Sequence, residues 1–188
     1  WELKKTESID VMDAVGSNIR IDSRGSQVMR VLPRLNEDVN EEWISDKTRY
    51  AIDGLRRQRL DRPYLRGRNG GLSPISWDEA LKTVATKLRK SKANRIAAIS
   101  GDQTDVESMF ALKLLMSKLG SPNLDCRQDG AKISGVRSGY IFNSTIAGID
   151  SADAILIIGS NPRLEAAVLN ARIRQNWLAK QTPIGVIG

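Results

Sequence analysis

Four polar residues near the start of the chain have the spacing of an iron–sulfur ligand set. Asp10, Asp13, Ser17 and Ser45 fit the pattern C-x2-C-x3-C-x27-C, although none of the four is cysteine. Thiolates hold iron–sulfur clusters, so these positions predict a site that binds no cluster. The chain has no histidine, which excludes Ser-His-Asp and Cys-His nucleophile systems and every imidazole metal site.

Longer runs of sequence around these positions resemble a known family. Residues 14–19 (Ala-Val-Gly-Ser-Asn-Ile) look like the Gly-Val-Gly-Cys-x-Ile of a cluster loop, and residues 38–50 resemble the segment around a fourth cluster cysteine. This frame is similar to the cluster domain that opens the molybdopterin oxidoreductases. The closer resemblance is to the large peripheral-arm iron–sulfur subunit of respiratory complex I, NADH:quinone oxidoreductase, in its alphaproteobacterial and mitochondrial form. It extends over nearly the whole chain through residues 6–18, 40–49, 53–60, 143–148, 159–163 and 170–174.

The resemblance implies an α/β protein of two parts. Residues 1–66 are expected to form a small, β-rich, degenerate domain of the 4Fe-4S type. Residues 67–188 are expected to form a partial doubly wound parallel-sheet domain of the molybdopterin oxidoreductase type, truncated at its C-terminus. We assign no catalytic, cofactor-binding or metal-binding residue to either part, and expect both to serve as scaffold.

The resemblance also implies a longer parent subunit, of which this sequence is expected to be a fragment. Such a parent would help to pass electrons from NADH, oxidised at a flavin, toward quinone, coupled to proton translocation. Its 2Fe-2S and 4Fe-4S clusters would lie upstream of the fragment, which itself would hold no cofactor. The implied partners are other peripheral-arm subunits, including the flavin-bearing one. The implied location is the cytoplasmic side of the bacterial inner membrane, or the matrix side of the mitochondrial one.

Hydrophobic patterning indicates how the first part folds. Residues 18–22 and 27–32 alternate around a turn in which Gly25 suits a positive φ, which predicts a β-hairpin. Pro33 should close the second strand because it has no N–H to donate. Residues 41–60 are helical in patches and offer a small core of Trp43, Ile44, Tyr50, Ile52 and Leu55. A domain this small usually needs a metal, so packing on the second part and on other subunits must substitute.

The second part alternates helices with short apolar strands. Two capping boxes, Ser76-Trp77-Asp78-Glu79 and Thr104-Asp105-Val106-Glu107, predict helices that run to about Lys90 and to Leu119. A further helix is predicted from Leu164 to about Leu178, and strands are predicted at 95–100, 154–158 and 184–187. This alternation is typical of a parallel sheet covered by helices on both faces.

One strand-end turn could carry chemistry. Residues 159–162 (Gly-Ser-Asn-Pro) resemble the loop that contacts the pterin dinucleotide in molybdenum enzymes, where small residues let backbone N–H groups approach a phosphate. The alternative is a tight turn and helix cap without a ligand. Molybdenum enzymes often continue this loop with a His-Pro pair, whereas Glu165-Ala166-Ala167 follows here. We therefore favour an inherited fold that binds no pterin. Residues 100–103 (Ser-Gly-Asp-Gln) are a weaker candidate and receive no role.

The net charge of +7 raises the alternative of a nucleic-acid-binding module. Seven arginines lie within twenty residues and only Asp53 and Asp61 oppose them there; the seven are Arg49, Arg56, Arg57, Arg59, Arg62, Arg66 and Arg68. Such a cluster could bind phosphates, with Tyr50 and Tyr64 stacking on bases. The segment lacks the pattern of any common nucleic-acid-binding fold. We favour arginines that pair with acidic surfaces of neighbouring subunits or are solvated, and expect no nucleic-acid partner.

Composition adds two expectations. The longest apolar stretch, residues 154–158, is far shorter than the ~20 residues of a membrane helix, so no direct membrane insertion is expected. Cys126 is the one cysteine, so no internal disulfide can form and a reducing compartment is indicated. We expect Cys126 to be a small core or near-surface residue rather than a nucleophile.

Overall fold

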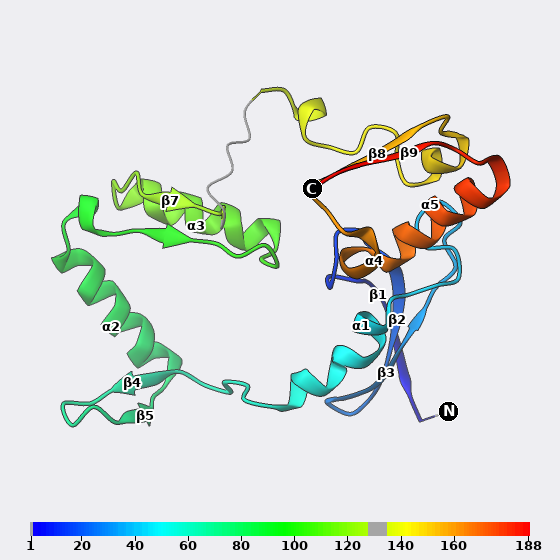
Figure 1. Cartoon of the computed structure of the whole chain (residues 1–188). Helices are drawn as coiled ribbons and strands as arrows, with labels where there is room; N and C mark the ends of the chain where they lie inside the picture. The colour runs from blue at the N-terminus through cyan, green and yellow to red at the C-terminus, as the bar shows by residue number, and fades with distance from the viewer. Residues whose placement is uncertain (1, 128–134) are drawn as a thin grey trace. The chain divides into compact units, whose positions relative to one another are not determined.

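A computed structural model describes residues 2–127 and 135–188 (Figure 1). Contacts divide the chain into two compact units. Unit 1 combines residues 1–57 with residues 134–188, and unit 2 comprises residues 58–133. The second half of unit 1 therefore comes from the region that the sequence assigns to the second domain. The predicted division into 1–66 and 67–188 differs from this division of contacts and stays a prediction.

The first half of unit 1 is an antiparallel three-stranded sheet followed by two short helical turns. The strands pair in the order β1-β2-β3, and the predicted hairpin is confirmed as β2 and β3. Gly25 lies in its turn with a φ of +58°, and Pro33 is the last residue of β3. The elements are β1 (Lys4–Ile9), β2 (Asn18–Arg24), β3 (Gln27–Pro33), helix α1 (Asp46–Tyr50) and the 3-10 helix η1 (Ala51–Arg56).

The core of this half is smaller than predicted. Ile19, Val31 and Ile44 are buried together, and Ile52 packs against them. Trp43, Tyr50 and Leu55 were predicted core residues but are more than half exposed, at 55%, 67% and 53%. Trp43 lies before α1 and outside any helix, and α1 is short and changes into a 3-10 helix after Tyr50. A stripe of side chains at α-helical spacing does not stay on one face when the helical period changes to three residues.

The second half of unit 1 contains a parallel strand pair and a broken helix. Strands β8 and β9 pair in parallel, as expected from their sequence. The predicted helix 164–178 is instead two helices, because Ala166 has a non-helical backbone (φ −147°, ψ 65°). The elements are the 3-10 helices η3 (Arg137–Gly139) and η4 (Ala147–Ser151), β8 (Ile155–Ile158), α4 (Pro162–Glu165), α5 (Ala167–Lys180) and β9 (Ile184–Ile187).

Polar contacts from α5 hold the two halves of unit 1 together. The Arg172 side chain is 4% exposed and pairs with Asp150 at 2.9 Å and with Glu41 at 3.3 Å. It also donates to the Glu37 carbonyl of the first half. One turn along α5, the Asn176 side chain donates to the Ile149 carbonyl at 2.6 Å, within the second half. The contacts of Arg172 with Glu37 and Glu41 show that the second half packs against the N-terminal one.

Unit 2 begins with a hairpin and continues with two helices and a short parallel strand pair. The Ser76 hydroxyl accepts from the Glu79 N–H at 3.2 Å, which confirms the first predicted N-cap. The second cap is Asp105 rather than Thr104, since the Asp105 carboxylate accepts from the Ser108 N–H at 2.7 Å. The elements are β4 (Tyr64–Arg66), β5 (Leu72–Pro74), α2 (Trp77–Lys90), the 3-10 helix η2 (Ala93–Arg95), β6 (Ala98–Ile99), α3 (Val106–Lys118) and β7 (Leu124–Asp125).

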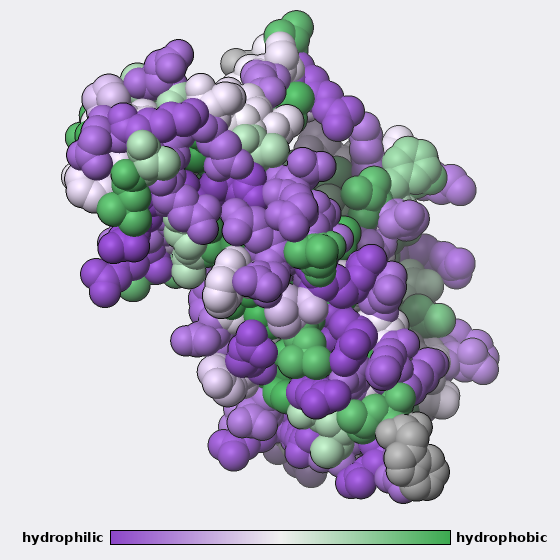
Figure 2. All heavy atoms as spheres, turned by 90° about the vertical axis from the view of Figure 1, so that its right-hand side faces the viewer, coloured by the Kyte–Doolittle hydropathy of each residue, from purple (hydrophilic) through white to green (hydrophobic). Residues whose placement is uncertain are grey.

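The mixed α/β class predicted from the sequence is confirmed, in a reduced form. Strand pairs β6–β7 and β8–β9 are parallel, but each is a separate two-stranded sheet among the described residues. The strand predicted at 95–100 is limited to β6, because η2 occupies its start. Hydrophilic residues predominate on the face drawn in Figure 2, with apolar residues scattered among them. No helix in the described ranges has the length and apolar character needed to cross a bilayer.

Replacing Arg172 by alanine is expected to destabilise unit 1 by about 3 kcal/mol, the lower end of the range for breaking a buried ion pair. The loss leaves Glu41 and Asp150 without their cation and the Glu37 carbonyl without its donor. Urea unfolding measures the change. Arg174→Ala is the matched control, because Arg174 is exposed on the same helix. Equal effects of the two substitutions would contradict the role given to Arg172.

Stability is expected to fall as the pH is lowered below about 4, in part through Asp22. The Asp22 side chain is buried and accepts from Arg20 and Arg30 at 2.9 and 2.7 Å, and these hydrogen bonds hold its pKa below the ordinary value of 3.8. A lowered pKa in the folded state means that this stabilisation is present above the unfolded pKa and is lost as the pH falls through the folded one. Asp22→Asn should weaken the decline of the urea midpoint with pH. Asp38→Asn, which changes an exposed carboxylate, should retain it.

Candidate functional site

The structure brings two of the cluster-spaced residues, Asp10 and Ser45, together around the Thr48 side chain. Asp10 and Ser17 bracket the loop between β1 and β2, and the Asp10 N–H donates to the Ser17 carbonyl at 2.8 Å. Ser45 caps α1, whose Thr48 lies one turn on. The Thr48 hydroxyl donates to the Asp10 carboxylate and lies 2.9 Å from the Ser45 hydroxyl. Asp10, Ser17, Ser45 and Thr48 are all buried.

The fourth position, Asp13, is held by a different partner. Its side chain is 3% exposed and lies 3.5 Å from the Lys47 ammonium. Each of the two carboxylates also accepts a hydrogen bond from the backbone. The Met12 N–H donates to the Asp10 carboxylate at 2.9 Å, and the Val15 N–H donates to the Asp13 carboxylate at 3.1 Å. The carboxylates of Asp10 and Asp13 and the hydroxyls of Ser45 and Thr48 are therefore engaged within the protein.

This arrangement does not fit an iron–sulfur cluster. Clusters of this kind are held by cysteine thiolates, and the positions present carboxylates and hydroxyls. Sequence reasoning found the four positions but missed Thr48 and Lys47, which connect them. A sequence signal for Thr48 existed in its spacing, three residues after a serine that could cap a helix.

The loop at 159–162 is also satisfied from within the chain. It follows β8, and Gly159 adopts a φ of +62° while its N–H donates to Ile187 at 2.7 Å. The Ser160 hydroxyl and the Asn161 N–H both donate to one oxygen of Glu165, at 2.6 and 2.7 Å. The Ser160 hydroxyl, followed by the Asn161 N–H, lowers the pKa of Glu165. The Glu165 carboxylate thus accepts from the hydrogen-bond donors that a dinucleotide phosphate would need. Its negative charge would also repel a phosphate.

Lys47 connects the two candidate sites. Besides its ion pair with Asp13, its ammonium donates to the Glu165 carbonyl at 3.1 Å. The same ammonium also contributes to lowering the pKa of Glu165. The cluster-like loop and the pterin-like loop are therefore joined by one lysine and two carboxylate residues.

The remaining candidates show no convergent chemistry. Cys126 is exposed just after β7, consistent with a near-surface residue. The Arg127 guanidinium engages the Asp125 carboxylate at 2.9 Å. No group of three or more His, Cys, Asp or Glu residues able to hold a metal ion occurs within residues 2–127 and 135–188.

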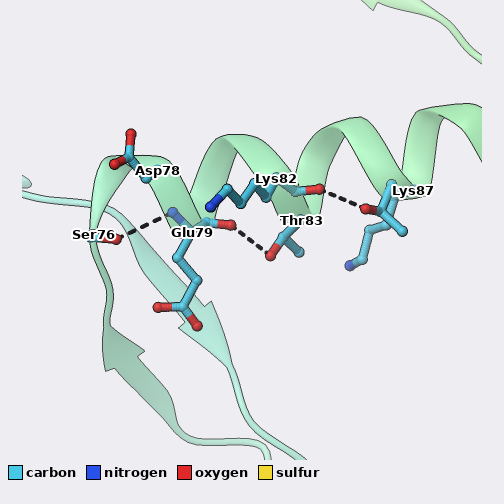
Figure 3. Close-up of a pocket in the computed structure, with 7 residues that line it drawn as sticks. Ser76, Asp78, Glu79, Lys82, Thr83 and Lys87 are labelled. Atoms are coloured by element: carbon cyan, nitrogen blue, oxygen red, sulfur yellow. Dashed lines mark hydrogen bonds between the residues drawn. The ribbon is translucent and has the colours of Figure 1, made fainter.

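A shallow hollow follows one side of α2 (Figure 3). Its hydrogen bonds are those of an ordinary helix: Ser76 caps the Glu79 N–H, and the Thr83 hydroxyl donates to the Glu79 carbonyl at 2.8 Å. The acidic and basic side chains along it point outward in Figure 3 without meeting at one point. This hollow offers no arrangement of an acid, a base and a nucleophile.

The arginine-rich segment is divided between the units. Arg49, Arg56 and Arg57 belong to unit 1, and the other four arginines belong to unit 2. Arg56 donates to the Val28 carbonyl at 2.8 Å, and Arg62 pairs with Asp61 at 2.7 Å. Closeness in sequence is therefore not sufficient to make these seven side chains one surface.

Comparison with known proteins identifies the family. The family model for molybdopterin oxidoreductase matches residues 59–188. The chain belongs to the molybdopterin oxidoreductase family. The model for the 4Fe-4S domain of the NADH-ubiquinone oxidoreductase NDSU1/NuoG-like proteins matches residues 3–53. The predicted order, a 4Fe-4S-type domain followed by a molybdopterin oxidoreductase domain, is confirmed.

Curated relatives of this molybdopterin oxidoreductase family member are similar along its whole length. The "NADH dehydrogenase [ubiquinone] iron-sulfur protein 1, mitochondrial" of Solanum tuberosum is 54% identical over 189 aligned residues. The "NADH-ubiquinone oxidoreductase 78 kDa subunit, mitochondrial" of Neurospora crassa and a subunit of the NADH-quinone oxidoreductase of Rickettsia conorii are each 56% identical. Each alignment covers 100% of this chain and 26–28% of the relative. The chain thus spans about a quarter of these relatives, and the predicted resemblance to the complex I subunit is confirmed.

Replacing Thr48 by valine tests the polar network at the cluster-like positions. Valine keeps the shape of threonine but removes the hydroxyl that joins Asp10 to Ser45, which leaves the buried Asp10 carboxylate without this donor and the buried Ser45 hydroxyl without this acceptor. We expect a loss of about 1–3 kcal/mol in the free energy of unfolding, measured in urea. Thr86→Val is the control, since the Thr86 hydroxyl donates to Lys82 on an exposed part of α2. It should change stability by less than about 0.5 kcal/mol.

Proposed function

We propose that this chain is a structural scaffold within the large iron–sulfur subunit of the peripheral arm of NADH:quinone oxidoreductase. The parent enzyme transfers electrons from NADH toward quinone, coupled to proton translocation. The proposal rests on the similarity to complex I subunits across the chain and on one structural observation. The positions with cluster spacing are occupied by Asp and Ser side chains, and three of the four contact neighbours: Asp10 and Ser45 bind Thr48, and Asp13 pairs with Lys47.

The scaffold role extends to the pterin-like loop. In the proposal this loop holds no dinucleotide, because Glu165 accepts from Ser160 and Asn161. No catalytic, cofactor-binding or metal-binding residue is assigned to the chain. The 2Fe-2S and 4Fe-4S clusters of the parent belong to its upstream region, and this chain supports the fold beside them.

The same proposal gives partners and location. The chain associates with other peripheral-arm subunits, including the flavin-bearing subunit. It lies on the cytoplasmic side of the bacterial inner membrane, or on the matrix side of the mitochondrial one. The similarity of the chain to bacterial and mitochondrial relatives supports this pair of locations.

Metal analysis tests the proposal. The chain is expressed in cells supplied with iron and molybdenum, purified without oxygen and analysed by elemental mass spectrometry. The expected result is folded protein with neither metal, because the oxygen ligands at the cluster-like positions are a poor substitute for thiolates. Near-stoichiometric iron or molybdenum would overturn the scaffold role.

A matched variant makes the metal result specific. It carries cysteine at all four positions, through Asp10→Cys, Asp13→Cys, Ser17→Cys and Ser45→Cys. Iron in this variant and none in the native chain would attribute the difference to the side chains rather than to the backbone of the loop.

A further inference from the structure

The turn of the β4–β5 hairpin contains the one asparagine of the sequence that is followed by a glycine, Asn69. Asn69 and Gly70 are both exposed to solvent. An asparagine loses its side-chain amide when the next peptide nitrogen attacks it, and a side chain on that next residue hinders the attack. Gly70 has no Cβ, so its peptide nitrogen is open to the side-chain carbonyl carbon of Asn69.

Hydrogen bonds within the turn hold the Asn69 amide beside this peptide group. The Asn69 side-chain oxygen accepts from the Gly71 N–H at 3.2 Å. Such an Asx turn folds the side chain back along its own backbone, across the intervening Gly70 peptide bond. The Gly67 N–H donates to the Gly71 carbonyl at 2.8 Å and closes the turn. Gly70 adopts a φ of +80°, which costs a glycine little, so the turn presents the two reacting groups to each other without strain.

A cation strengthens the hydrogen bond on the Asn69 side-chain oxygen. The Arg66 guanidinium donates to the Gly70 carbonyl at 2.5 Å, and this carbonyl shares its peptide group with the Gly71 N–H. A cation on the carbonyl polarises the peptide group and makes its N–H a better donor. Negative charge develops on the Asn69 oxygen when its carbonyl carbon is attacked, and the Gly71 N–H already donates to that atom. An oxyanion hole lowers a reaction barrier in the same way.

One hydrogen bond in the turn opposes the attack. The Gly70 N–H donates to the Gly67 carbonyl at 3.0 Å, and the nitrogen must lose this proton before it attacks. Residues 66–71 are all exposed, so water can replace the Gly67 carbonyl as the partner and solvent hydroxide can take the proton. This hydrogen bond therefore slows the attack without preventing it.

We propose that Asn69 is a site of spontaneous deamidation, promoted by the Gly71 N–H and the Arg66 guanidinium. The Gly70 nitrogen, after its proton passes to hydroxide, forms a bond to the side-chain carbonyl carbon of Asn69. The bond from that carbon to Nδ2 breaks, and ammonia leaves with a proton from water. Water then opens the resulting succinimide at either carbonyl, which gives aspartate or isoaspartate. In sum one water is consumed and one ammonia is released, without oxidation or reduction. The reacting groups belong to adjacent residues, so the attack needs no encounter between molecules.

Deamidation changes the more basic unit of the chain. Unit 2 carries 14 Lys and Arg residues against 8 Asp and Glu residues, a net charge of +6. The reaction replaces a neutral amide by a carboxylate next to Arg68 and lowers this charge to +5. Isoaspartate also adds a methylene to the backbone between residues 69 and 70, within the ring that the Gly67–Gly71 hydrogen bond closes. The hairpin turn is thus altered in charge and in length, and this change is independent of the scaffold role.

Peptide mapping by mass spectrometry tests the proposal on the full chain, incubated at neutral and at mildly alkaline pH. Asn94 and Asn143 are internal controls, because both are exposed but are followed by Arg95 and Ser144. We expect Asn69 to convert at least about tenfold faster than either control, because a Cβ on the next residue hinders the attack. The rate at Asn69 should rise with pH, since the attacking nitrogen must be deprotonated. A protein isoaspartyl methyltransferase with labelled S-adenosylmethionine measures the isoaspartate formed.

Variants at position 66 test the role given to the guanidinium. Arg66→Gln should slow the conversion of Asn69 by at least about threefold, because the Gly71 donor loses its polarising cation. Arg66→Lys keeps a cation within reach of the Gly70 carbonyl, so its rate should stay within about twofold of the native one. Arg59→Gln is the matched control, since it removes an exposed cation of unit 2 outside the hairpin and should leave the rate unchanged. Circular dichroism checks that each variant is folded.

The outcomes separate the site from its promotion by Arg66. Conversion of Asn69 no faster than that of Asn94 and Asn143 would overturn the site, and a rate that does not depend on pH would contradict attack by the peptide nitrogen. Equal rates in Arg66→Gln and Arg59→Gln would overturn the contribution of the guanidinium, as would a loss in Arg66→Lys as large as in Arg66→Gln. None of these results bears on the metal analysis, which tests the scaffold role separately.

Discussion

Arg172 lies buried where the two sequence-separated halves of unit 1 meet, and a buried guanidinium must find acceptors in the protein. It has acceptors in both halves. The Glu37 carbonyl and the Glu41 carboxylate belong to the first half, and the Asp150 carboxylate belongs to the second. In the described part of the first half, the core cluster has three buried residues, Ile19 and Val31 of the sheet and Ile44 before α1. A domain this small needs support beyond its own core, and the junction at Arg172 supplies contacts of that kind.

The two sites inherited from redox relatives show a common physical solution. A cluster would supply bonds that hold the loop between β1 and β2 to the start of α1. Here the hydroxyls of Ser45 and Thr48 and the carboxylate of Asp10 make that connection. A dinucleotide phosphate would satisfy the donors of the loop after β8, and the Glu165 carboxylate satisfies them instead. In both places, hydrogen bonds between side chains and loop connect elements that a bound group would otherwise connect.

Unit 2 presents the opposite situation. Its helices are capped at Ser76 and Asp105, so their ends are stabilised locally. Yet none of the residues of α2 is buried, and α3 buries only Met116. Unit 2 therefore combines exposed apolar side chains with a net charge of +6. Such a surface is suited to contact with another protein surface, because apolar side chains can be buried and basic side chains can pair with acidic ones in the same contact. A scaffold role requires surfaces of this kind.

The sequence by itself determined the local structure and the family. Alternation around Gly25, the serine cap at Ser76 and the apolar runs of β8 and β9 depend on neighbouring residues, so they could be predicted from the chain alone. The absence of cysteine at four spaced positions likewise led to the prediction of no cluster, from the sequence alone. Tertiary structure alone decided which side chains contact these positions. Thr48, Lys47 and Arg172 act through partners up to 135 residues away, and no local pattern encodes such partners. It also decided that Trp43 and Tyr50 are exposed, because burial depends on which elements pack, not on side-chain type.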